Sequence, residues 1–150
     1  MKARSLHILA TVLFGGLLLA SCSTDTTTTS GTAPTPSLAP GVHSVDVIFL
    51  DHPPMKPVLA EVDTVLARYA GKISVNKLPA DGAEGARRAE DLGLSGHIAF
   101  VVAIDGSTEA DIGGRTVRFE GFPVGKSPID SAQGAWSVAD LDAVLAQRTG

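Results

Sequence analysis

The sequence has a single cysteine, Cys22, and this scarcity limits its chemistry. Thiol–disulfide exchange needs a thiolate that attacks a disulfide, so a chain without a second cysteine carries no internal redox pair. Cationic clusters are missing as well, since 12 Lys and Arg residues stand against 16 Asp and Glu residues and the formal net charge is −4. An acidic chain of this kind is not expected to bind nucleic acid or to dock electrostatically on an anionic lipid surface.

The N-terminal apolar stretch, residues 8–20, is too short for a stable membrane span. It follows Lys2 and Arg4 and leads into Leu19-Ala20-Ser21-Cys22, a layout that predicts a secretory signal peptide over residues 1–21. Those four residues resemble the lipobox of bacterial lipoproteins. The resemblance implies cleavage before Cys22, acylation of its thiol, and anchoring through lipid to the extracytoplasmic face of a bacterial membrane. The alternative is an ordinary signal peptide with an incidental cysteine.

Residues 22–42 form a Thr-, Ser- and Pro-rich segment, and residues 23–41 contain one large apolar side chain, Leu38. Such a composition does not bury enough surface to order itself, so we expect a disordered tether. Loss of Lys2 and Arg4 with the signal peptide would change the net charge from −4 to −6. We expect one folded domain over residues 43–150.

Strand and helix patterns alternate through the first half of this domain. Apolar runs predict strands over residues 45–50, covered on both faces, and 98–104, the most hydrophobic strand and the expected centre of the sheet. A second short strand is expected over residues 73–78. Helical spacing predicts a helix from Pro57 to Tyr69, ended by Gly71. A second helix is expected over residues 82–92, with Asp81 as its cap and a buried face made of Ala83, Ala86 and Ala89.

Hairpin signals dominate the second half. Asp105-Gly106 and Gly113-Gly114 predict tight turns, and residues 115–119 alternate so that Val117 and Phe119 should face inward. A loop rich in Gly, Pro and Ser spans residues 121–134. Ser137 and Asp140 have capping-box spacing for a final helix, with Trp136 just before it. The order of elements predicts an α/β fold with a mixed central sheet and helices on both faces.

The turn after the first strand, His52-Pro53-Pro54-Met55-Lys56, resembles the Cys-Gly-Pro-Cys-Lys turn of thioredoxins and keeps its second-half proline and its lysine. Residues 93–99, followed by an apolar strand and Asp105-Gly106, are similar to the thioredoxin stretch before the central hairpin. The resemblance implies a thioredoxin-like fold. Both redox cysteines are replaced, and the family's cis-proline position falls on Ile98 or Ala99, so disulfide chemistry is not implied.

Three side chains are expected to meet at this turn: His52, Met55 and His97, the last because the resemblance places its loop against the turn. Two imidazoles and a thioether suit copper, above all Cu(I), and Asp51 could add an oxygen ligand for a harder ion. The alternative is structural: His52 caps the turn, Met55 fills the core, and His97 bonds a backbone carbonyl. Pro53-Pro54 is interpreted as a device that fixes the helix entry, with a rigid knob for a partner as the alternative.

The remaining motifs give weaker predictions of function. Residues 121–127 echo a phosphate loop, but Glu120 stands where the first glycine is needed and Pro128 prevents a helix from starting. No Ser-His-Asp arrangement is apparent. Phe119, Phe122 and Trp136 are interpreted as a satellite core or, alternatively, as a docking surface on a long loop. The sequence thus favours a non-enzymatic binding or scaffold module with an unidentified envelope protein as partner; the alternative is a copper-handling protein.

Overall fold

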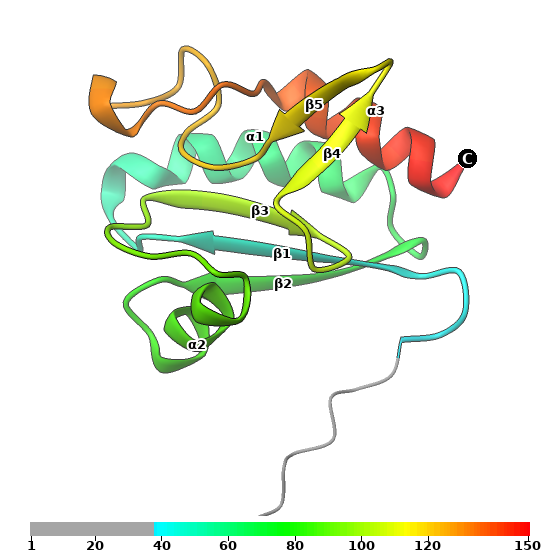
Figure 1. Cartoon of the computed structure of the whole chain (residues 1–150), viewed down its shortest axis with the longest axis horizontal. Helices are drawn as coiled ribbons and strands as arrows, with labels where there is room; N and C mark the ends of the chain where they lie inside the picture. Colours follow the sequence, from blue (N-terminus) through cyan, green and yellow to red (C-terminus); the bar gives the residue numbers. More distant parts are fainter. Residues whose placement is uncertain (1–37) are drawn as a thin grey trace, which may run out of the picture. The chain divides into compact units, whose positions relative to one another are not determined.

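The computed structural model describes residues 38–150 (Figure 1). The signal peptide, Cys22 and the tether up to residue 37 lie outside the described residues. None of the helices in residues 38–150 combines the length and the apolar character that crossing a membrane requires. The elements in chain order are β1 (His43–Phe49), the 3₁₀ helix η1 (Pro53–Met55), α1 (Lys56–Ala67), β2 (Ile73–Pro79), α2 (Ala83–Asp91), β3 (Phe100–Ile104), β4 (Glu109–Ile112), β5 (Arg115–Arg118), η2 (Asp130–Ala132) and α3 (Val138–Thr149).

The main sheet has the order β2-β1-β3. β1 is parallel to β2 and antiparallel to β3, so Val47 lies opposite both Lys77 and Val102. The sheet is therefore mixed, as the sequence predicts, but the expectation that the most hydrophobic strand is its centre was wrong. All five residues of β3 are buried, yet its second edge meets only a short return of the chain, where the Val102 amide donates to the Phe119 carbonyl at 3.0 Å. β1 is central because both of its edges carry full ladders.

Helices cover the two faces of this sheet (Figure 1). α1 and α3 pack on one face, where alternate β1 residues such as Val45 and Val47 join the larger core cluster. α2 packs on the other face against Ile48, Val101 and their neighbours. The alternation of β1 side chains between the two clusters follows from the two-residue period of a strand, and it explains why β1 reads as a nearly continuous apolar run.

α2 differs in detail from its prediction. Gly82, not Asp81, occupies the N-cap, and no side chain caps the helix. Ala83 and Ala86 are exposed, and the buried face consists of Gly85 and Ala89. A Cβ atom at Gly85 would overlap the backbone carbonyl of Pro79, so the helix approaches the chain too closely for any residue larger than glycine. Periodicity alone does not reveal such a backbone contact.

Both predicted tight turns are confirmed, but only the second closes a hairpin of paired strands, because β3 and β4 belong to different sheets. Asp105 (φ 51°) and Gly106 (φ 79°) form a two-residue turn closed by reciprocal hydrogen bonds between Ile104 and Ser107. Two glycines with positive φ connect β4 to β5, whose Val117 faces the core. This β4–β5 hairpin forms a separate two-stranded sheet.

The predicted start of the last helix is also confirmed. Ser137 and Asp140 form a complete capping box: the Asp140 amide donates to the Ser137 hydroxyl at 3.2 Å, and the Ser137 amide donates to the Asp140 carboxylate at 2.8 Å. Burial by itself would raise the pKa of Asp140, but the hydrogen bonds from Ser137 and the nearby Arg115 guanidinium lower it below its usual value.

One buried charge interrupts the apolar run of β1. The side chain of Asp46 is almost fully buried and accepts from Arg88 Nε at 2.8 Å and from Asn76 Nδ2 at 2.7 Å. A second guanidinium nitrogen of Arg88, Nη2, lies 2.7 Å from Asp46 Oδ2, the oxygen that also accepts from Nε. Arg88 therefore joins α2 to the centre of the sheet through a buried ion pair.

Removing one member of such a pair leaves the other charge buried and poorly compensated. We expect Arg88→Met, which keeps an apolar stem, to lower the free energy of unfolding by about 3 kcal/mol. Urea denaturation followed by circular dichroism measures this loss. The control is Arg87→Met, because Arg87 is exposed and makes no ion pair within residues 38–150. Equal midpoints for the two variants would show that the pair does not hold α2 in place.

Candidate functional site

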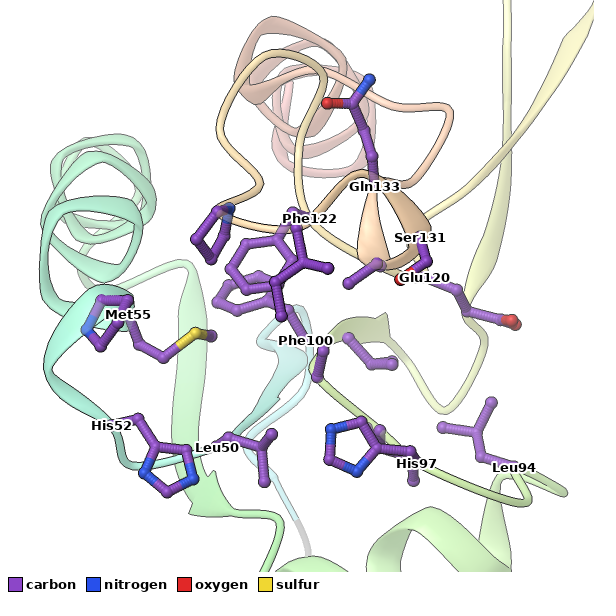
Figure 2. A pocket seen from close by; sticks show the side chains of 18 of the residues that line it. Leu50, His52, Met55, Leu94, His97, Phe100, Glu120, Phe122, Ser131 and Gln133 are labelled. Atoms are coloured by element: carbon purple, nitrogen blue, oxygen red, sulfur yellow. The ribbon is translucent and has the colours of Figure 1, made fainter.

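An open cavity of about 590 Å³ lies where β1 ends (Figure 2). Three stretches of chain line it: the turn after β1, the segment leading into β3, and the loop between β5 and α3. Its lining is mainly apolar, with Leu50 and Phe100 among the contributors and His97 and Glu120 among the polar exceptions. A preformed concavity with a mainly apolar lining and a few polar groups is the usual form of a binding site.

The first wall is the proline turn. The Leu50 amide donates to the Ala99 carbonyl at 3.2 Å, which fixes the start of the turn against the segment before β3. Pro53–Met55 then form one turn of 3₁₀ helix that runs directly into α1. Met55 is buried in the core, as the structural interpretation expected, whereas both prolines are exposed. The paired prolines thus preset the helix entry and present their rings at the surface.

The loop of residues 121–134 forms another wall, and its two ends are tied together. The Phe122 amide donates to the Ala132 carbonyl at 2.9 Å, and the Gly134 amide returns a bond to the Phe122 carbonyl at 2.7 Å. A side chain at Gly134 would overlap the Glu120 carbonyl, so this closure requires glycine. Lys126 Nζ also reaches a carboxylate oxygen of Glu61 on α1 at 2.7 Å. These bonds hold the wall in place before any partner arrives.

The loop aromatics do not form a docking surface. Phe119, Phe122 and Trp136 are all at least 97% buried and belong to the main core, not to a satellite cluster. The Trp136 ring stacks on Phe100 with centroids 6.1 Å apart and meets Phe119 edge-on at 5.3 Å. Its indole nitrogen donates to a backbone carbonyl, which satisfies the polar atom inside the core.

The loop exposes two large hydrophobic side chains, both aliphatic. Val124 is 54% exposed and Ile129 is 62% exposed. Ile129 lines the cavity and Val124 does not. Neither residue was predicted to belong to the site, although a large aliphatic residue in a loop rich in Gly, Pro and Ser is a signal for an exposed contact.

The three predicted metal ligands line the same cavity, whereas Asp51 does not. His52 and His97 are both exposed, and neither imidazole forms a hydrogen bond with another described residue, although the His52 backbone bonds to Leu50 and Met55. His52 therefore occupies the N-cap position of η1 but makes no side-chain capping bond, and the expected bond from His97 to a backbone carbonyl is wrong. In Figure 2 the Leu50 side chain stands between the two imidazole rings, and the Met55 thioether points toward Phe100 and Phe122.

Within residues 38–150, no three His, Cys, Asp or Glu side chains are close enough to hold a metal ion together. A metal at this turn would therefore depend on the thioether of Met55 as well as on the imidazoles. Cys22, the predicted lipid attachment site, lies outside the described residues.

The serine hydroxyls and imidazoles at the cavity are not paired as a nucleophile and a general base. Ser95 and Ser131 line it, but in the part of the chain that the structure describes no hydrogen bond joins either hydroxyl to His52 or His97. The sequence that echoes a phosphate loop leads into Pro128 and a single 3₁₀ turn, so it presents no helix N-terminus to an anion.

Comparison of this chain with protein-family models, with curated proteins and with solved structures finds no match. Its function is therefore inferred from the residues of the site.

Proposed function

We propose that this chain is a lipid-anchored protein of the bacterial envelope whose thioredoxin-like domain binds a segment of a partner protein and performs no thiol redox chemistry. The observation that carries this proposal is the preformed, mainly apolar cavity at the end of β1. Backbone hydrogen bonds fix two of its walls, the proline turn and the loop of residues 121–134, so these two walls require little ordering when a partner binds.

The strand arrangement supports the thioredoxin-like part of the proposal. β1 is parallel to one neighbour and antiparallel to the other, and a proline turn leads from β1 into α1 at the sequence that resembles the thioredoxin turn. A redox role is disfavoured by the sequence itself, since His52 and Met55 occupy the positions that correspond to the two cysteines.

A polypeptide is a suitable occupant because one stretch of the wall has backbone groups that lack hydrogen-bond partners. Ser95, His97 and Ile98 line the cavity, and the segment 95–98 makes no backbone hydrogen bond with any other described residue. Free N–H and C=O groups along a chain segment can pair with an extended peptide, which then adds its side chains to the apolar pocket beside them.

This proposal predicts that Ile129 contacts the partner and Val124 does not. A photoreactive amino acid at position 129 is expected to crosslink to one discrete envelope protein in intact cells, and the same amino acid at position 124 is not. Once that protein is identified, Ile129→Ser should weaken its binding at least tenfold, because burying an isoleucine contributes about 1.5–3 kcal/mol. Val124→Ser is the matched control, since it lies on the same loop outside the cavity. Crosslinking that is equal at both positions, or absent from both, would contradict the assignment of the cavity as the docking site.

The lipid anchor makes a separate prediction. Cys22→Ala should abolish incorporation of labelled fatty acid and release the protein into the soluble envelope fraction, because the thiol that accepts the acyl chains is lost. Ser23→Ala, one residue further along, should stay lipidated and membrane-bound. Retention of Cys22→Ala in washed membranes would show that the lipobox interpretation is incorrect.

A second candidate function is Cu(I) binding, and one observation favours it: His52, Met55 and His97 line a single cavity. Imidazole and thioether ligands suit Cu(I). Competition titration with a chromophoric Cu(I) chelator should then give one-to-one binding that His52→Ala and His97→Ala both abolish. His43→Ala is the control, because His43 lies at the opposite end of β1 and pairs with Asp105 at 2.8 Å. Binding no stronger than that of the denatured chain would rule this candidate out.

A further inference from the structure

We propose that the segment bound at the cavity is cationic: an extended polypeptide in which Lys or Arg side chains alternate with large apolar ones. This inference rests on the binding function proposed above and names the chemistry of its partner. It is carried by a second cavity, by the charges around both cavities, and by the geometry of an extended chain.

The second cavity, of about 280 Å³, lies between the segment before β3 and α2. It shares four lining residues with the first cavity, Leu50, Leu94, His97 and Ile98. The two are therefore neighbouring parts of one concave surface, which we call the groove. The groove extends from the loop of residues 121–134 to α2, and its shared centre is mainly apolar.

No Lys or Arg lines either part of the groove, whereas carboxylates do. Asp81 and Glu90 line the second cavity, and neither forms an ion pair with another described residue. Glu120, in the first cavity, differs because it accepts from Thr108 at 3.0 Å and lies 4.0 Å from Arg118.

Two further carboxylates stand beside the groove. Asp51 and Asp130 are exposed, without an ion-pair partner in residues 38–150, and each is next in sequence to a lining residue, His52 and Ser131 respectively. Lys56 and Arg87 are also exposed, without an ion pair in residues 38–150, and next in sequence to the lining residues Met55 and Ala86, but most other Lys and Arg side chains of the domain are ion-paired elsewhere. The carboxylates without an ion pair outnumber these two cations, so the edge of the apolar concavity carries an excess of negative charge, which attracts cations and repels anions.

An extended polypeptide can match both the apolar centre of the groove and the carboxylates at its edge. Its backbone can hydrogen-bond to the free N–H and C=O groups on either side of the bend at Gly96 (φ 85°), while its own successive side chains point to opposite sides. One set of side chains can reach the apolar centre at Leu50 and Ile98, while the other set reaches the carboxylates at the edge. Alternation of apolar and cationic residues is the pattern that fits.

The test uses the full lipidated chain in nanodiscs of neutral phosphatidylcholine, with empty nanodiscs as background. Three fluorescent peptides of equal length serve as probes, alternating Leu–Lys, Leu–Ser or Leu–Glu, and binding is followed by fluorescence anisotropy. We expect the Leu–Lys peptide to bind roughly tenfold more tightly than the Leu–Ser peptide at low ionic strength. This advantage should shrink as salt is added, because exposed charges are screened.

Variants then locate the charge. Asp81→Asn and Glu90→Gln should each weaken Leu–Lys binding roughly three- to fivefold and leave Leu–Ser binding unchanged. Asp111→Asn is the matched control, because Asp111 is an exposed carboxylate on β4 that has no ion pair in the described domain and lines neither cavity. It should change nothing.

The outcomes separate this inference from the function on which it rests. If all three peptides bind equally and Ile129→Ser weakens all of them, the groove binds polypeptide but the cationic inference is overturned. Preference for the Leu–Glu peptide overturns it as well. If no peptide binds above the empty nanodiscs, or if Ile129→Ser changes none of the affinities, both the inference and the proposed binding function fail.

Discussion

The central position of β1 is the constraint on which the rest of the domain depends. Ladders occupy both of its edges, and helices cover both of its faces. The chain that leaves Phe49 must therefore turn at the end of the sheet, where the segment before β3 lies directly alongside. The proline turn, the backbone of segment 95–98 and the loop before α3 gather at this end, and the groove forms between them.

Local signals in the sequence were sufficient for the order and type of the elements. Turn residues such as Asp105-Gly106 and the Ser137–Asp140 box act over a few residues, so their structure follows from their neighbours. What failed depends on long-range contacts. The apolar content of β3 did not reveal that β1 pairs on both edges, and alanine spacing in α2 did not reveal that Gly85 touches the Pro79 backbone.

In the candidate site, too, the features set by local sequence were predicted and those set by long-range contacts were not. The resemblance of the turn to that of thioredoxins led to His52, Met55 and His97, and the structure places all three on one cavity. The outer wall was not foreseen, because it depends on hydrogen bonds between residues about ten positions apart and on the space that Gly134 leaves free. Asp46 was overlooked for a related reason, since its ion-pair partner Arg88 lies on a distant helix.

The two candidate functions compete for the same surface. His97 lines both parts of the groove, and Met55 fills the base of the proline turn, so a Cu(I) ion held there would occupy space beside the apolar centre. A cationic segment in the groove and a metal cation at the turn would repel each other, and by linkage each would lower the affinity of the other. The free carboxylates do not decide between them, because both ligands are positive. The bare backbone of segment 95–98 does favour one, since it offers hydrogen bonds that a polypeptide can use and that Cu(I), which prefers soft ligands, does not need.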